Sequence, residues 1–264
     1  AVRQPSRIAR AQGHTSDTPT SPVLICRPAS GDHGQVIDLF AAAALALPTE
    51  DATPTEPTKA PTLAEVYAGD AKIKPDMAGK SVQRIQEQLN GIGKPTEITG
   101  VFDQQTRKAY KSYQDKFGYW PTGIVTQHQA LKLRKLYGNG KLPKACKTGH
   151  VLCIDKTQLV LRMMQNGKQQ LVTDVRFGAE QTPTRNGKFR VYSKVRYLIS
   201  ALAGTPMPYS LFFSGGQAVH YSPGFHRDGY NGASLGCVNV RVFKDAKKIY
   251  NTSKVGTEVY VYRS

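Results

Sequence analysis

The spacing of apolar residues changes near residue 150, and this change restricts the chain to a helical part followed by a β-rich part. Between residues 81 and 136, apolar residues recur at three- and four-residue steps, the period of a helix with one buried face. From residue 151 onward, short apolar and β-branched runs are separated by glycine-containing turns, which is typical of strands. Because 264 residues suffice for two hydrophobic cores, the sequence predicts an α+β chain with two folded domains.

Three helices are expected in the helical part. The first follows Ser81, which suits an N-cap, and the second begins after Asp103. The third begins at Thr126, where Gln129 three residues later predicts a capping box. The positions of the first helix that are expected to be buried are Val82, Ile85, Leu89 and Ile92. Together these segments predict a small three-helix bundle.

The β-rich part is expected to form an antiparallel β-sandwich or a barrel-like sheet. Two runs within residues 152–178 are joined across Asn166 and Gly167, a pair that favours a tight hairpin turn. Only "VFKDAKKIYN" (242–251) has a helical pattern, and "TEVYVYRS" (257–264) ends the chain as a strand. Many short strands with few helices predict a mainly β domain.

The first 62 residues are expected to form a tail and linker. The apolar run "VIDLFAAAALAL" (36–47) is too short to cross a bilayer. Because it contains Asp38 and lacks basic residues immediately before it, it is an ambiguous signal-like segment. The run that follows is rich in Pro, Thr and acidic residues, as in a flexible tether. The expected organisation is a tail over 1–62, a helical domain over 63–141 and a β domain over 142–264.

The net charge favours some classes of partner over others. The chain has 36 Lys and Arg residues against 19 Asp and Glu residues, a net charge of +17 at pH 7. This excess favours polyanionic partners, namely nucleic acid, anionic lipid surfaces or the phosphate-bearing polymers of a bacterial wall. The basic residues are scattered over every segment, so a generally cationic surface is favoured over a dedicated nucleic-acid groove.

Cys146 and Cys153, in "CKTGHVLC", are interpreted as a disulfide. The loop between them is short enough to be closed by a turn between two extended segments. The alternative is a metal site, but the spacing is not that of a zinc knuckle and only His150 is nearby. We therefore expect no metal and no cofactor. A structural disulfide implies an oxidising compartment outside the cytosol, and it leaves Cys237 as a free thiol.

The segment "NGASLGCVNVR" (231–241) contains that free cysteine. A reactive cysteine needs a base that holds it as thiolate, a group that orients the base, and donors for an oxyanion. His220 ends an apolar run 17 residues before Cys237, a separation that allows the two side chains to meet. Ser234 and Gly236 let the backbone turn tightly, so that the amides of Gly236 and Cys237 can point at a substrate carbonyl. Each residue alone has a structural interpretation, but together they predict a nucleophile and its base.

These residues resemble the L,D-transpeptidases of bacterial cell walls, also called the YkuD domain. That family has a histidine ahead of the pattern Ser/Thr-x-Gly-Cys-x-Asn/Arg. The matching positions here are His220, Ser234, Gly236, Cys237, Asn239 and Arg241. "TPTRNGKFRV" and "MPYSLFFSGGQAVH" are also similar to family segments, and the resemblance covers about residues 151 to 262. Many members have histidine where this chain has Leu235, so a side-chain hydrogen bond is expected to be lost while the backbone amide is kept.

The helical part has a resemblance of its own. "SVQRIQEQLNGIG" and "GVFDQQTRKAYKSYQDKFG" resemble the peptidoglycan-binding domain found beside wall hydrolases and transferases, over about residues 76 to 136. An ordinary three-helix module would explain its aromatic residues equally well. The two resemblances and the disulfide fit an actinobacterial type. They imply a location outside the cytoplasm, in the cell wall, either secreted or tethered to the membrane.

The resemblance implies acyl transfer on peptidoglycan stem peptides. Cys237 would attack the carbonyl of the third, diamino-acid residue and release the terminal D-alanine, while His220 carries the proton. An amine of a second stem would resolve the thioester and form a 3→3 cross-link. The main-chain carbonyl of Tyr221 would orient His220, and the Gly236 amide would bind the oxyanion. The residues expected to contact substrate are Tyr209, Ser234, Asn239 and Arg241. A plain core aromatic is the alternative for Tyr209, and bracing the loop is the preferred alternative for Asn239.

Three other functions stay open on the sequence alone. An L,D-carboxypeptidase or endopeptidase would use the same acyl-enzyme with water as acceptor. A catalytically weak wall-binding protein would explain Leu235, and a nucleic-acid binder rests only on the charge. The expected partners are donor and acceptor stem peptides, wall glycan and anionic wall polymers, with carbapenem-type β-lactams as covalent inhibitors. No nucleic-acid partner is expected.

Overall fold

The structure is a computed structural model that describes residues 56–264, except Lys141 and the side chain of Asn139. The described residues belong to one compact unit. The signal-like segment (36–47) and most of the expected tether lie outside the described residues. Among the residues that are described, no helix is long and apolar enough to span a membrane.

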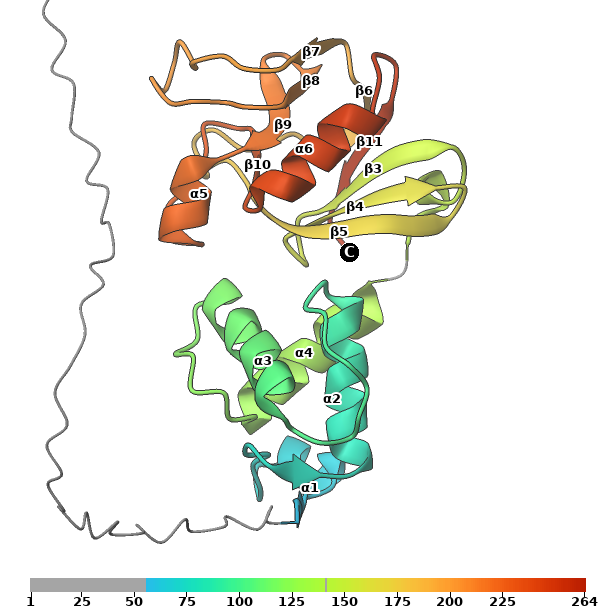
Figure 1. Cartoon of the computed structure of the whole chain (residues 1–264), viewed down its shortest axis with the longest axis vertical. Helices are drawn as coiled ribbons and strands as arrows, with labels where there is room; N and C mark the ends of the chain where they lie inside the picture. Colours follow the sequence, from blue (N-terminus) through green and yellow to red (C-terminus); the bar gives the residue numbers. More distant parts are fainter. Residues whose placement is uncertain (1–55, 141) are drawn as a thin grey trace, which may run out of the picture. The chain divides into compact units, whose positions relative to one another are not determined.

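Four α-helices lie between residues 56 and 140 (Figure 1). They are α1 (Leu63–Ala68), α2 (Lys80–Gly91), α3 (Gln104–Lys116) and α4 (Gln127–Asn139), accompanied by the short parallel strands β1 (Thr58–Lys59) and β2 (Met77–Ala78). The prediction of three helices missed α1 because six residues are too few to show a period, although a capping box of Thr62 and Glu65 holds it. Asp103 caps α3 as predicted. The four predicted core positions are all fully buried: Val82, Ile85, Leu89 and Ile92.

Two helix starts differ from the predictions. The N-cap residue of α2 is Gly79 rather than Ser81. Thr126 is the N-cap residue of α4, but its side chain makes no cap hydrogen bond, so the predicted capping box is not formed. The side chain of Gln129 instead accepts a hydrogen bond from Gln114 at 3.0 Å, because this amide faces the neighbouring helix rather than its own N-terminus.

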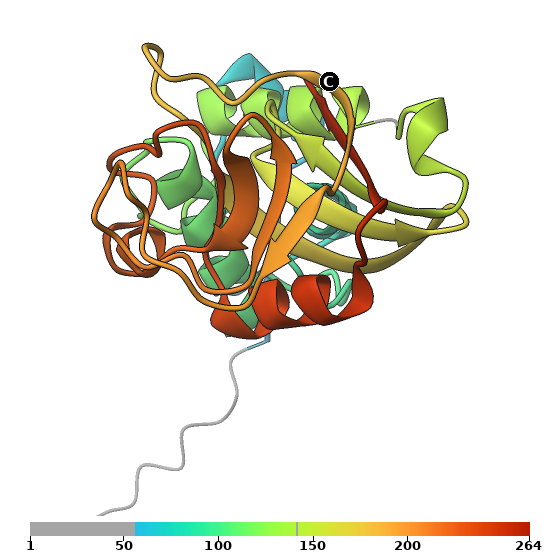
Figure 2. The same cartoon turned by 90° about the horizontal axis from the view of Figure 1, so that it is seen from above.

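Nine strands of the described chain form one curled sheet (Figures 1 and 2). In sheet order they are β6 (Gly187–Arg190), β11 (Glu258–Tyr262), β3 (His150–Asp155), β4 (Val160–Gln165), β5 (Lys168–Arg176), β10 (Val238–Val240), β9 (Gln217–Tyr221), β8 (Ser210–Ser214) and β7 (Ser193–Val195). Neighbours are antiparallel except for β3 with β11 and β9 with β10, which are parallel. The predicted α+β class is confirmed, with the barrel-like alternative in place of a two-sheet sandwich.

Two α-helices pack with the sheet. α6 (Phe243–Thr252) was predicted, and it buries Ala246 and Ile249 in the core of the sheet. α5 (Pro223–Asp228) was missed, again because six residues show no period. The Ser222 hydroxyl caps α5 by accepting the N–H of Phe225 at 3.2 Å. A short 3₁₀ helix, η1 (Lys144–Cys146), precedes β3.

Two local predictions in the β-rich part are confirmed. Cys146 and Cys153 form a disulfide. Asn166 and Gly167 have φ values of 48° and 77°, as a tight turn between β4 and β5 requires. In both cases the partners are close along the chain, which is why a local pattern was enough to find them.

Candidate active site

Strands β9 and β10 bring the predicted catalytic residues together. In their parallel pairing, Val219 lies opposite Val238 and His220 lies opposite Asn239. Because side chains alternate along a strand, His220 and Asn239 share a face with Cys237, the residue immediately before β10. Cys237 and His220 line the same cavity, of about 320 Å³.

Both ring nitrogens of His220 are hydrogen-bonded. Nδ1 donates to the Tyr221 carbonyl oxygen at 2.7 Å, and Nε2 accepts from Nδ2 of Asn239 at 2.9 Å. The bond to the carbonyl selects the tautomer in which Nε2 carries the lone pair. Burial lowers the pKa of His220 to about 4, and the hydrogen bond to Tyr221 offsets only part of this change. The imidazole is therefore neutral at pH 7 and can act as a base.

Cys237 is a free thiol, as predicted, and it is partly exposed. Burial raises the pKa of the thiol, and a hydrogen bond to the backbone of Ala218 offsets only part of this change. The sequence predicts a histidine that holds the cysteine as thiolate. The structure differs, because a buried neutral imidazole supplies no positive charge to stabilise a thiolate. The thiol proton must therefore move as an electrophile arrives.

The depressed pKa of His220 makes stability depend on pH. The unfolded imidazole binds a proton below about pH 6.5, whereas the folded one stays neutral down to about pH 4. The unfolded chain binds more protons in this window. The free energy of unfolding should therefore fall by about 1–3 kcal/mol as the pH is lowered from about 6.5 to about 4. His220→Gln should remove this part of the slope. Urea unfolding of the parent and of His220→Gln at several pH values in this window measures the effect. If the free energy of unfolding had the same pH dependence in both proteins, the prediction would be contradicted.

Ser234 holds the turn before Cys237. Its hydroxyl donates to the Cys237 carbonyl oxygen at 2.6 Å and accepts the Gly236 N–H at 3.1 Å. The Gly236 amide, which was expected to face an oxyanion, is thus already bonded inside the turn. Ser234 lines the cavity, but both of these hydrogen bonds stay within its own loop. It braces the backbone that carries the cysteine.

A second segment, which was not predicted from the sequence, supports this loop. The Thr184 hydroxyl donates to the Gly236 carbonyl oxygen at 2.8 Å and accepts the Gly178 N–H at 3.0 Å. A Cβ on Gly178 would lie 2.8 Å from the Gly236 Cα and would also clash with the Thr182 carbonyl oxygen. Only glycine fits at this position. Nothing in the local sequence indicates that it touches a loop so far along the chain.

Tyr209 does not line the cavity, although it was predicted to contact substrate. Its ring packs against Phe243 and Tyr250, with centroid distances of 5.3 and 5.6 Å. Its backbone has a φ of 59°, an unusual conformation for a non-glycine residue, which sets the direction of this side chain. Met207 from the same segment lines the cavity instead.

The basic residues at the cavity also differ from the prediction. Arg241 lies outside it, with its guanidinium 3.7 Å from the Asp115 carboxylate. Arg176 and Arg227 line the cavity instead. Arg176 donates to two backbone carbonyls of the loop 229–231, at 3.0 and 2.9 Å. No sequence signal distinguishes these two among 36 basic residues, because Arg176 at the end of β5 and Arg227 in α5 meet at the site only in the folded chain.

A thiol and a neutral imidazole in one cavity, with a main-chain carbonyl orienting the imidazole, define a site that can carry cysteine-dependent acyl transfer. Residues 149–261 match the family profile described as the L,D-transpeptidase catalytic domain, YkuD. Residues 78–133 match the profile of a peptidoglycan binding domain. The chain therefore carries a YkuD L,D-transpeptidase catalytic domain with a peptidoglycan-binding domain N-terminal to it.

Solved structures have a similar fold. An L,D-transpeptidase from Stackebrandtia nassauensis is 23% identical with a TM-score of 0.50, over 70% of this chain and 92% of that one. Residues 123–326 of an L,D-transpeptidase from Xylanimonas cellulosilytica are 23% identical with a TM-score of 0.47, over 70% and 94%. At this identity the likeness to the first structure supports the fold alone. No curated protein sequence matches the chain.

Proposed function

We propose that this chain is a cell-wall L,D-transpeptidase that forms 3→3 cross-links between stem peptides and releases terminal D-alanine. The observation that carries the proposal is the cavity shared by Cys237 and the oriented His220, within a domain that matches this family. The proposed catalytic domain spans 142–264 and the proposed wall-binding domain spans 63–141. The enzyme acts outside the cytoplasm.

Acylation begins with proton transfer inside the cavity. As Cys237 Sγ bonds to the carbonyl carbon of the third, diamino-acid residue, its proton moves to Nε2 of His220. Asn239 must release Nε2 for this step, and with its amide turned over its oxygen can accept the new Nε2–H. The Tyr221 carbonyl keeps the ring in place. The carbon–nitrogen bond then breaks, and His220 returns the proton to the leaving D-alanine amine.

The acyl-enzyme is resolved by a second stem. Its amine nitrogen bonds to the thioester carbonyl carbon, the carbon–sulfur bond breaks, and the amine proton passes through His220 back to sulfur. The proposed oxyanion donors are the amides of Cys237 and Gly236. The Gly236 amide becomes available when the Ser234 hydroxyl rotates away from it.

Incubation with a disaccharide tetrapeptide should separate the transferase from its alternatives. Transferase and carboxypeptidase share the thioester and differ only in whether an amine or water resolves it. Chromatography with mass spectrometry should find 3→3 dimers and one D-alanine for each bond formed. Tripeptide monomers alone would identify an L,D-carboxypeptidase. A folded chain that yields neither product would be a catalytically weak wall-binding protein.

The helical part is proposed to hold the enzyme on wall polymer. The full chain with Cys237→Ala, which cannot turn over, should co-sediment with insoluble peptidoglycan. Because the net charge of +17 adds attraction to an anionic wall, the bound fraction should fall as salt is raised. The measurement is the protein left in the supernatant, with a tube lacking peptidoglycan as control. Full recovery in the supernatant at low salt would make this part a spacer.

A further inference from the structure

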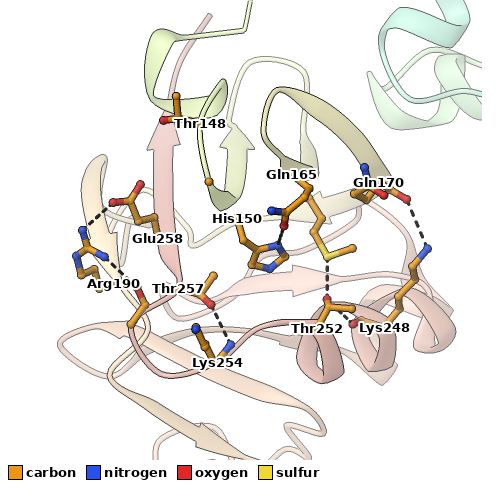
Figure 3. A pocket seen from close by; sticks show the side chains of 13 residues that line it. Thr148, His150, Gln165, Gln170, Arg190, Lys248, Thr252, Lys254, Thr257 and Glu258 are labelled. Atoms are coloured by element: carbon orange, nitrogen blue, oxygen red, sulfur yellow. Dashed lines mark hydrogen bonds and ion pairs between the residues drawn. The ribbon is translucent and has the colours of Figure 1, made fainter.

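A second cavity lies in the catalytic domain, and no residue that lines it also lines the Cys237 cavity. Its volume is about 850 Å³, within the range of ligand-binding pockets. Figure 3 shows His150 at its centre, between the β4–β5 hairpin and the segment that joins α6 to β11. The mechanism above uses none of its residues.

The cavity has positive charge that no neighbouring carboxylate neutralises. Its charged residues are Arg190, Lys248 and Lys254 against the single carboxylate of Glu258. Glu258 is already paired with Arg190 at 2.7 Å. The Lys248 ammonium reaches only the Gln170 carbonyl oxygen, at 3.5 Å, and within residues 56–264 the Lys254 ammonium makes no hydrogen bond or ion pair. Two ammonium groups are therefore free to bind an anion.

Several polar side chains of the lining are held in place by hydrogen bonds. The His150 ring contacts the Gln165 side-chain oxygen at 3.2 Å and the Ser253 hydroxyl at 3.4 Å. The Thr257 hydroxyl accepts the Lys254 N–H at 2.9 Å, which fixes the loop that carries this lysine. Threonine hydroxyls and glutamine amides can both donate to and accept from the hydroxyl groups of a ligand.

The composition of the lining selects among anions. It contains no Phe, Tyr or Trp on which nucleic-acid bases could stack, and the two other planar side chains that can stack on a base, His150 and Arg190, are already bonded to neighbouring residues. Lysines act as point charges toward phosphate, whereas planar carboxylate recognition favours arginine, and Arg190 is already occupied. We propose that this cavity binds a phosphate-linked polyol, such as a segment of an anionic wall polymer. The inference rests on the proposed wall location but not on turnover at Cys237.

Calorimetric titration of the full chain with poly(glycerol phosphate) tests the site. The variant Lys248→Gln with Lys254→Gln should bind about tenfold more weakly. The logarithm of its binding constant should also fall less steeply with the logarithm of the salt concentration. The magnitude of this slope should decrease by about two, because two phosphate contacts are lost. The control, Lys135→Gln with Lys247→Gln, removes the same charge from exposed residues that line neither cavity, and its affinity should stay within about twofold of the parent's. The release of D-alanine should be the same in all three proteins.

Three outcomes would overturn the inference. Equal weakening of binding in both double variants would mean that binding follows net charge alone. If the unmodified chain did not bind poly(glycerol phosphate), this polymer would not be the ligand of the cavity. Anionic vesicles of equal phosphate content should not distinguish the two variants. Selective loss of vesicle binding by the cavity variant would instead assign the site to lipid headgroups. A chain that binds the polymer through these lysines but releases no D-alanine would contradict the proposed reaction and leave this inference standing.

Discussion

Cys237→Ala should abolish the release of D-alanine from a tetrapeptide stem, with a loss of about 10⁴-fold or more. Without the sulfur no acyl-enzyme can form, and the cavity retains only binding and orientation. Cys237→Ser should reduce the release of D-alanine almost as much. A neutral, buried His220 is a weak base toward an alcohol, whose proton is far harder to remove than that of a thiol. Amino-acid analysis of released D-alanine measures the loss.

The control for this result is a variant of the cavity rim that leaves the chemistry intact. Leu235→Ala changes an exposed side chain that lines the same cavity, and it should retain most of the activity. Intact mass after incubation with a carbapenem should increase in the parent and in Leu235→Ala but not in Cys237→Ala. A folded Cys237→Ala protein that still releases D-alanine would show that another residue is the nucleophile.

Asp174→Asn should lower the free energy of unfolding by about 3–5 kcal/mol. The Asp174 carboxylate binds the ammonium groups of Lys94 at 2.5 Å and Lys116 at 2.8 Å. The Lys116 side chain is 0% exposed and that of Lys94 is 5% exposed, so the variant would leave two buried amines without a carboxylate partner. Burial already lowers the pKa of Lys116 to about 8, and without Asp174 this amine would lose its proton. Urea unfolding should show a lower midpoint with an unchanged slope.

The ionisation of this cluster supports the size of the effect. Burial raises the pKa of Asp174, but Lys116 and Lys94 lower it more, and the result is about 2. The carboxylate therefore stays charged throughout the neutral range. Replacing all three residues by apolar ones of similar size should restore much of the stability, because no charge is then buried alone. A change below about 1 kcal/mol in Asp174→Asn would show that water reaches the lysines.

Features with a local cause could be predicted from the order of the amino acids. Apolar spacing identified α2, α3, α4 and α6, and it separated the helical part from the β-rich part. Asn166 and Gly167 specified their turn, since few other residue pairs adopt positive φ at both positions. The short loop between Cys146 and Cys153 was enough to predict their disulfide. Cys237 and His220 were found as a pair because their chemistry needs both.

The arrangement and the ionisation of Cys237 and His220 depend on contacts that form only in the folded chain. The parallel pairing of β9 with β10 places Asn239 against His220, and nothing in either strand specifies its partner. Burial by distant segments makes the imidazole neutral and raises the pKa of the Cys237 thiol, so the resting pair is a thiol with a neutral base and not the thiolate that the motif indicated. Tyr209 and Arg241 fit the family pattern but do not line the cavity, because the Tyr209 ring packs against α6 and the Arg241 guanidinium lies 3.7 Å from the Asp115 carboxylate of α3. Strand pairing and burial depend on residues far apart in the chain, and therefore no local pattern contains them.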